Sequence, residues 1–211
     1  MDFPFLEYLS LMAAFAVAAI VPGLDFAMVL RQSIAHGRAA ALATSAGIAS
    51  SILVHGTYTI LGIGFVISQS ILLFNLLKFA GALYLLWIGI DAFRAPPPAA
   101  PTLSDENATR TISLRQAFVQ GFLTNLLNPK AVVFFLALFS TLVSAHTPSP
   151  VKGFYVVNMS AMLFAWFAFV SVVFTTTRVR NAFFRFGKWF NRMTGATFVA
   201  LAASIAFTRQ H

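Results

Sequence analysis

Two proline-containing breaks interrupt long apolar stretches of this chain, about half a chain length apart. Pro22 and Gly23 divide an apolar stretch that runs from about residue 5 to about residue 34. Asn128 and Pro129 divide a second one, from about residue 114 to about residue 144. Proline lacks a backbone donor and glycine tolerates unusual backbone angles, so a helix is expected to break at each place.

Composition places these breaks in a membrane. Hydrophobic residues make up 59% of the 211 residues and charged residues only 9%, whereas a soluble domain has roughly 25% charged residues. A membrane-spanning helix needs about 20 apolar residues. The sequence therefore predicts an all-α integral membrane protein with six transmembrane helices, over residues 5–34, 40–67, 71–93, 114–144, 151–175 and 193–208.

A Pro-rich, polar segment divides the chain into two halves of three helices. Residues 94–113 include Pro96, Pro97 and Pro98 and cannot bury enough apolar surface to fold alone. We interpret them as a cytoplasmic linker between a first repeat, residues 1–93, and a second, residues 114–211. Because three spans is an odd number, the second half enters the membrane from the opposite face, which predicts two inverted repeats, each with its first helix broken at a Pro.

Basic residues indicate the orientation. The net charge is +8, and positively charged loops stay in the cytoplasm. Most Lys and Arg fall after the first, third and fifth spans, which predicts a multi-pass protein of a bacterial-type plasma (inner) membrane with both termini outside the cytoplasm. No basic segment is long enough for a separate nucleic-acid-binding domain, and the N-terminus lacks the basic region of a cleaved signal peptide.

Corresponding breaks in two inverted halves point to a binding site near the bilayer midplane. A half-helix that starts after a break has free amide donors and a positive dipole end, which suit a carboxylate. A half-helix that ends at a break offers carbonyls, which suit an ammonium group. A zwitterionic substrate would match both, and the alternative is a pair of kinked helices without a ligand. The predicted substrate-binding residues are Pro22, Gly23, Asp25, Asn125, Asn128, Pro129 and Lys130.

Three motifs resemble the LysE/RhtB family of amino-acid exporters. They are Val21-Pro22-Gly23-Leu24-Asp25 with the following Val29–Arg38 stretch, Leu77–Leu85 with Gly89, and Phe122–Lys130. The resemblance implies six spans, uptake of substrate from the inside, and export of amino acids or related metabolites driven by the proton-motive force. Family members often have Pro-Gly-Pro where this chain has Pro22-Gly23-Leu24, and a Pro-Gln-Phe-like element where it has Phe139-Ser140-Thr141.

Asp25 is the first candidate for function. A carboxylate at membrane depth is costly, and its neutral form is favoured there. Asp25 can therefore carry a proton between the two facing states, pair with a substrate ammonium, or simply cap the resumed helix. Lys130 follows the second break as Asp25 follows the first, so it can pair with Asp25 or hold a substrate carboxylate.

Two further residues are proton-coupling candidates alongside Asp25. His55 lies on a polar face of the second span, and its ordinary pKa near 6.5 suits a proton relay. A single His on such a face also serves as a hydrogen-bonding partner. Lys78 lies about two turns into the third span, where it can balance Asp25 or extend its ammonium group to the membrane surface. Asn125 and Asn128 can line the site or cap the broken helix.

Other function classes fit the sequence less well. The chain has no Cys, only His55 of four His lies inside a predicted span, and no Gly-rich phosphate loop is present, so we expect neither an enzyme, a metal site nor a cofactor. An ion or metal-cation channel or exporter is the main alternative, and an intramembrane enzyme a weaker one. The expected partners are an amino acid or analogue, protons and membrane lipid. Ala-rich helix faces suit a homo-oligomer and equally suit packing within one chain.

Overall fold

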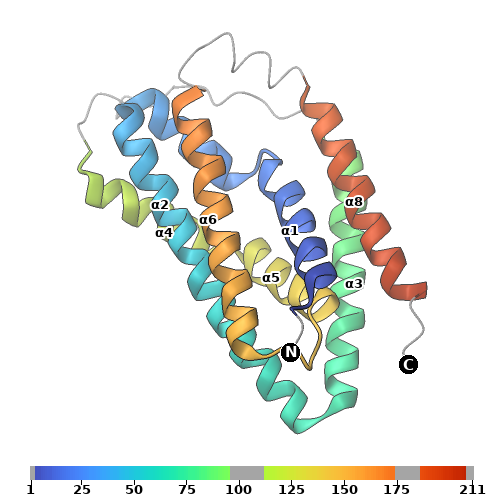
Figure 1. Cartoon of the computed structure of the whole chain (residues 1–211). Coiled ribbons are helices and arrows are strands. Elements are labelled where there is room, and N and C mark those ends of the chain that lie inside the picture. Colours follow the sequence, from blue (N-terminus) through green and yellow to red (C-terminus); the bar gives the residue numbers. More distant parts are fainter. Residues whose placement is uncertain (1–2, 96–111, 174–185, 208–211) are drawn as a thin grey trace.

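Helices account for all the regular structure that is described. The computed structural model describes residues 3–95, 112–173 and 186–207. They form α1 (Phe5–Ile20), α2 (Leu24–Gln69), α3 (Ile71–Arg94), α4 (Leu114–Leu126), α5 (Pro129–Leu142), α6 (Ser149–Val173) and α8 (Gly187–Phe207), and no strand occurs within these ranges (Figure 1). The all-α class is confirmed. Most of the predicted linker, residues 96–111, lies outside the described residues. So do three of the basic residues that follow the fifth predicted span, Arg178, Arg180 and Arg185.

Both expected interruptions separate two helices. α1 ends at Ile20 and α2 begins at Leu24, with Gly23 as an extended residue between them. α4 ends at Leu126 and α5 begins at Pro129, and the two helices bend by 59°. Proline suits the first position of α5 because its missing N–H would have no helical partner there. The Asn128 side chain caps α5 by accepting a hydrogen bond of 3.0 Å from the Lys130 backbone N–H.

A further bend divides α2 at Gly37. Its φ of 81° and ψ of 179° lie outside the helical region, and residues before and after it are helical. A positive φ of this kind is readily adopted by glycine and strained for other residues. The bend lies between the first two predicted spans, residues 5–34 and 40–67.

The structure contains fewer long apolar helices than the six predicted spans. Within the described residues, three stretches are long and apolar enough to cross a membrane, Leu24–Val66, Leu72–Arg94 and Ser149–Val173. The bent pair α4 and α5 would make a fourth if it forms one span, and α1 is a shorter apolar helix. α8 begins at Gly187, six residues before the predicted start of the last span, because the helix continues through Lys188 and Arg192. The six-span inverted repeat stays a prediction.

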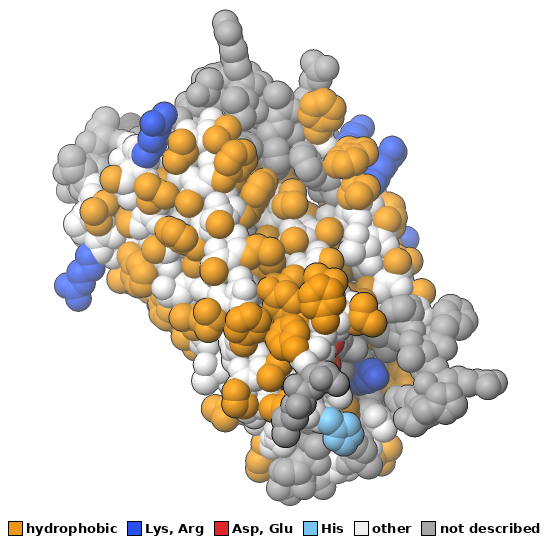
Figure 2. Space-filling model, viewed as in Figure 1, with side chains coloured by type: hydrophobic (Ala, Val, Ile, Leu, Met, Phe, Trp, Pro, Cys, Tyr) orange, Lys and Arg blue, Asp and Glu red, His pale blue; other side chains and the backbone are white. Residues whose placement is uncertain are grey.

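The outer surface suits a lipid environment. Large apolar side chains are exposed on several helices, among them Leu6 at 79%, Leu61 at 68% and Leu83 at 68%. Figure 2 shows hydrophobic side chains spread over the visible face, with few Lys and Arg side chains, mostly at its periphery. A soluble monomer rarely exposes so large an apolar area. This surface, together with the apolar helices, indicates a multi-pass membrane protein.

Glycines let α2 and α4 pack closely. A Cβ on Gly47 would overlap the carbonyl oxygen of Phe118, and a Cβ on Gly121 would overlap that of Thr44. The Thr44 hydroxyl also donates a hydrogen bond of 3.1 Å to the Ala117 carbonyl on α4. Small residues allow helix backbones in membranes to approach in this way. The α2–α4 interface matters for the site because it brings Asn125, in the last turn of α4, beside Ser51 and His55 of α2.

We expect Gly121→Ala to destabilise the protein. The added methyl group has no space against the Thr44 carbonyl, so α2 and α4 must separate, and overpacking of this kind typically costs about 1–3 kcal/mol. Thermal unfolding in detergent measures the loss. Gly62→Ala is the matched control, because a Cβ on Gly62 meets nothing within 4 Å. Equal unfolding temperatures for both variants would contradict the close approach.

Candidate functional site

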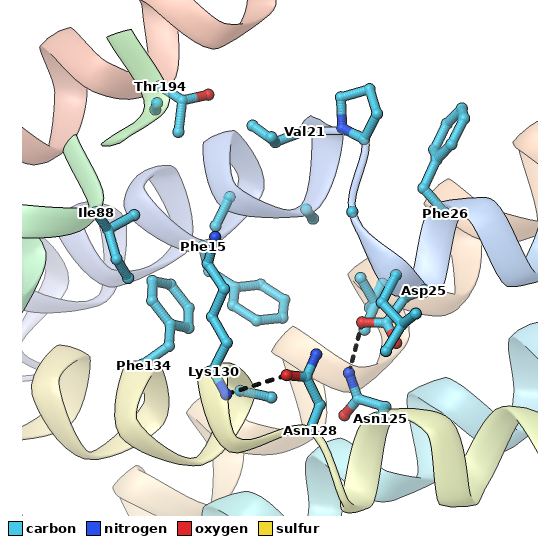
Figure 3. A pocket seen from close by; sticks show the side chains of 18 of the residues that line it. Phe15, Val21, Asp25, Phe26, Ile88, Asn125, Asn128, Lys130, Phe134 and Thr194 are labelled. Carbon is cyan, nitrogen blue, oxygen red and sulfur yellow. Dashed lines mark hydrogen bonds between the residues drawn. The ribbon is translucent and has the colours of Figure 1, made fainter. Parts of the chain in front are cut away.

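A cavity of about 320 Å³ borders both helix breaks. From the first break it is lined by Val21, Pro22, Gly23 and Asp25, and from the second by Asn125, Asn128 and Lys130. Figure 3 shows Val21 and Asp25 from the first set facing Asn125, Asn128 and Lys130 from the second. Of the seven residues predicted to bind substrate, Pro129 alone is not in the lining; it starts α5.

The two breaks also contact each other directly. The Asn125 Nδ2 atom donates a hydrogen bond of 2.7 Å to Oδ2 of Asp25 (Figure 3). The second carboxylate oxygen, Oδ1, is buried and has no hydrogen-bond partner among the described residues. Leaving a buried acceptor unpaired costs free energy. Asp25 can therefore accept a further hydrogen bond from a donor that enters the cavity.

Asn125 is the centre of a buried hydrogen-bond network. Its Oδ1 atom lies 2.6 Å from the Ser51 hydroxyl, which donates to it, and 3.1 Å from Nε2 of His55. His55 Nδ1 in turn bonds to the Tyr58 hydroxyl. Ser51, His55 and Tyr58 lie on one face of α2 because they are spaced by three and four residues. The sequence placed His55 on a polar face of the second predicted span, and in the structure Ser51 and His55 are both fully buried.

Lys130 lies at the other side of the cavity from Asp25. Its side chain extends from the first turn of α5 beside Phe15 of α1 (Figure 3). The ion pair with Asp25 that the sequence left open is absent in the described structure, where the carboxylate contacts Asn125 instead. The ammonium group therefore stays free of that pairing and borders the cavity.

The proton-coupling candidates have different positions. His55 is linked to Asp25 through Asn125: its Nε2 atom bonds to the Asn125 side chain, which in turn donates to Asp25. Lys78 is a half-buried residue of α3 and is not among the residues that line the cavity. The hypothesis that the Lys78 charge balances the charge of Asp25 is therefore not supported by a direct contact.

Several lining residues escaped the sequence reasoning. Aromatic and aliphatic side chains form the cavity wall, including Phe15, Phe134, Phe135, Ile52 and Ile88. Asp91 of α3 and Asn191 and Thr194 of α8 also line it, and Thr194 lies on the side away from Asp25 (Figure 3). In a chain with so many Phe residues, no sequence signal separates wall residues from ordinary core. Asp91 could have been singled out as an acidic residue near the end of an apolar span.

A second polar cluster ties down the opposite end of α1. Glu7 accepts hydrogen bonds from the Ser144 backbone N–H at 2.8 Å, the Thr147 hydroxyl at 2.9 Å and the Tyr155 hydroxyl at 3.1 Å. Glu7 lies about 20 Å along the helix from Ile20, since each residue adds about 1.5 Å. These contacts join α1 to the α5–α6 connection on the side away from the breaks.

The described residues contain no group of three His, Asp or Glu side chains that could hold a metal ion. The polar groups that line the cavity are two carboxylates, those of Asp25 and Asp91, the Lys130 ammonium group, several Asn amides and the Thr194 hydroxyl. Such a set can bind a small molecule that carries both charges.

Comparison with known proteins identifies the family. The family model described as "LysE type translocator" matches residues 16–209. The threonine efflux protein of Escherichia coli K12 is 26% identical over 202 residues, 96% of this chain and 98% of that protein. The homoserine/homoserine lactone efflux protein of Salmonella typhimurium LT2 is 34% identical over 130 residues, 62% of this chain and 61% of that protein.

An uncharacterised membrane protein of Bacillus subtilis, YrhP, is 26% identical over 199 residues, 90% of this chain and 95% of that protein. No solved structure shows a significant match. The family match covers nearly the whole chain and confirms the resemblance seen in the sequence motifs. The chain belongs to the LysE type translocators and is a membrane transport protein rather than an enzyme.

Proposed function

We propose that this protein exports a small amino acid or a related amine-bearing metabolite in exchange for protons. The observation that carries the proposal is the Asp25 carboxylate, whose Oδ1 atom is buried without a hydrogen-bond partner among the described residues and which shares a cavity with Lys130. The relatives named for threonine and for homoserine efflux support the same substrate class.

The cavity suits a small zwitterion. Its volume of about 320 Å³ falls at the lower end of the range for small-molecule pockets, about 300–1,000 Å³. In our proposal the substrate ammonium donates to Asp25 Oδ1 and the substrate carboxylate lies against the Lys130 ammonium. Phe15 and Phe134 cover the aliphatic part of the substrate. Asn128 caps α5 and keeps its first turn, with Lys130, at the edge of the cavity.

Alternating access around this cavity is the proposed mechanism. The cavity extends past Asp91 to Ala95 and Asn191, and the Asn191 side chain donates a hydrogen bond of 3.3 Å to the Ala95 carbonyl. Ala95 immediately precedes the predicted cytoplasmic linker. The described conformation would therefore face the cytoplasm, while the Glu7 hydrogen bonds keep the opposite side closed. Export requires those bonds to open.

Asp25 is also the proposed proton carrier. A group that binds both the substrate ammonium and a proton, but not both at once, couples their movements in opposite directions. Protonation from outside would release the substrate, and deprotonation to the cytoplasm would restore the site. This competition requires only one carboxylate at the bottom of the cavity.

Two further features complete the proposal. The order helix, break, helix in α1–α2 and again in α4–α5 supports the inverted-repeat arrangement of the two halves. The basic residues of the predicted cytoplasmic loops support an inner-membrane location with both termini outside. The small side chains on the Ala-rich face of α1 would allow a second copy of this chain to pack against it, as in a homo-oligomer.

Counterflow in proteoliposomes tests the function. Purified protein is reconstituted into vesicles loaded with unlabelled threonine, and uptake of labelled threonine, homoserine and lysine is followed. We expect saturable uptake of the small neutral amino acids, which collapses when the loaded amino acid is left out. An ohmic current without saturable exchange would instead identify a channel and would reject the proposal.

A further inference from the structure

We propose that His55 is a positioning residue, which holds the Asn125 side chain so that its amide nitrogen faces Asp25. Ser51 assists it. The role of the two residues in transport rests on the proposed function, whereas the hydrogen-bond direction that we assign to them does not.

The Asn125 backbone carbonyl determines which His55 nitrogen carries hydrogen. Nε2 of His55 lies 3.3 Å from this carbonyl oxygen and 3.1 Å from the Asn125 side-chain atom assigned as Oδ1. A backbone carbonyl can only accept, so Nε2 must be the donor. The side-chain atom beside Nε2 must then accept as well, which makes it the amide oxygen.

The opposite end of the same amide follows from this assignment. With Oδ1 turned toward His55, Nδ2 points to Asp25 and donates to its Oδ2 atom at 2.7 Å. When Asp25 is ionised, a flipped amide would bring its oxygen against the carboxylate, where both atoms only accept. His55 therefore selects the orientation in which Asn125 stabilises the carboxylate.

Ser51 alone cannot make this selection. Its hydroxyl lies 2.6 Å from Asn125 Oδ1 and also 2.6 Å from the Ile48 carbonyl of its own helix. A hydroxyl has one hydrogen but can also accept. If Ser51 donated to Ile48, it could accept from a flipped Asn125 amide, so it tolerates either orientation.

The His55 ring is itself held in place. It is fully buried and stacks on Phe135 of α5, with a centroid distance of 5.4 Å and an interplanar angle of 23°. Its Nδ1 atom bonds to the Tyr58 hydroxyl one turn along α2. With hydrogen on Nε2, neutral Nδ1 accepts from Tyr58, so each donor in the series from Tyr58 through His55 and Asn125 points toward Asp25.

This arrangement favours a positioning role for His55 over a role as a proton relay to Asp25. The Asn125 amide stands between the imidazole and the carboxylate, and an amide does not readily exchange protons in transit. A relay residue would need its own contact with Asp25, and the bonds of His55 go to Asn125 and Tyr58. His55 therefore acts on the site through Asn125.

Combining substitutions at His55 and Asn125 tests the inference. Threonine counterflow is measured for His55→Phe, Asn125→Ala and the double variant, and both the half-saturation concentration and the maximal rate are determined. We expect His55→Phe to raise the half-saturation concentration about tenfold, because the Asn125 amide loses its orienting donor. In the double variant His55→Phe should add nothing to the Asn125→Ala loss, whereas multiplied losses would overturn the proposal.

Conservative variants sharpen this result. His55→Gln offers an amide donor without a titrating ring and should recover most of the affinity, which a proton relay would not allow. Ser51→Ala should weaken threonine binding less than His55→Phe. Ser50→Ala is its matched control, since the Ser50 hydroxyl bonds only to the Ala46 carbonyl of its own helix.

An independent measurement needs no transport. Nitrogen-15 NMR of histidine-labelled protein in lipid reports which ring nitrogen carries hydrogen, and subtraction of the His55→Gln spectrum isolates the His55 signals. We expect the neutral form with hydrogen on Nε2; hydrogen on Nδ1 alone would overturn the assignment. If this form is found but wild-type protein exchanges neither threonine nor homoserine, the proposed function fails while the assigned geometry stands.

Discussion

Asp25→Asn is expected to leave a folded protein that no longer exports its substrate against a gradient. Asn has nearly the same shape as Asp and can still bond to Asn125, so the α2–α4 contact persists. The variant loses the negative charge that would bind an ammonium group and the group that would carry a proton. We expect proton-driven efflux of threonine to fall at least about 100-fold, since breaking a buried charged interaction costs about 3–5 kcal/mol.

Two assays on the same variant separate the two roles of Asp25. Counterflow needs substrate binding but no proton movement, whereas efflux driven by a pH gradient needs both. If Asp25 binds the ammonium group, both activities disappear; if it carries only the proton, counterflow survives and stops responding to the gradient. Wild-type efflux from Asp25→Asn would remove the residue from the mechanism altogether.

Asp91→Asn provides the comparison within one cavity. Asp91 also borders the cavity, but it is exposed and lies toward the end lined by α8. Neutralising it removes a charge from the entrance and leaves the buried carboxylate intact. We expect a much smaller loss, confined to the half-saturation concentration.

The interruptions of the helices were predictable because their causes are local. Pro22 and Gly23 disfavour a continuous helix whatever surrounds them, and Pro129 favours a helix start. The polar face of α2 was also readable, since Ser51 and His55 repeat with the helical period. These features depend on residues near one another in the sequence.

The contacts across the cavity depend on how the helices cross, and a local sequence pattern does not determine that crossing. A symmetrical reading of the two breaks allowed an ion pair between Asp25 and Lys130, or a substrate carboxylate held by Lys130. The close approach at Gly47 and Gly121 instead brings the last turn of α4 beside Ser51 and His55 in the middle of α2, and from there Asn125 bonds to Asp25.

In the sequence of the fourth predicted span, polar residues recur every four positions and so share one helical face, with Asn125 beside them. They are Gln116, Gln120, Thr124 and Asn128. In the structure Asn125 is the buried one, at 3% exposure. Gln116 instead forms a capping box with Ser113 at the start of α4. The polar residues therefore predicted which helix carries the site, whereas tertiary packing determined that Asn125 is the residue buried in it.

Lys130→Gln should distinguish substrates by their carboxylate. Homoserine and homoserine lactone both carry an amine, but the lactone has no free carboxylate, and both appear in the name of one relative. If Lys130 binds the substrate carboxylate, its loss weakens homoserine and leaves the lactone nearly unaffected. A charged hydrogen bond contributes about 1.5–3 kcal/mol, so we expect the half-saturation concentration for homoserine to rise about 10- to 100-fold.

The lactone also separates Lys130 from Asp25. Asp25→Asn should abolish transport of both compounds, because both present an ammonium group to the carboxylate. Lys130→Arg keeps the charge and should retain homoserine transport. Lys188→Gln removes the same charge from an exposed residue of α8 that does not line the cavity, and we expect it to alter neither substrate.

Competition between the two compounds makes the result independent of protein yield. When both are present outside loaded vesicles, the ratio of homoserine to lactone uptake depends only on their relative efficiencies of transport. Lys130→Gln should shift this ratio toward the lactone. An unchanged ratio with lower uptake of both would show that Lys130 supports the fold of the α5 start, and the substrate carboxylate would then have to bind elsewhere, such as the free amides at the first turn of α2.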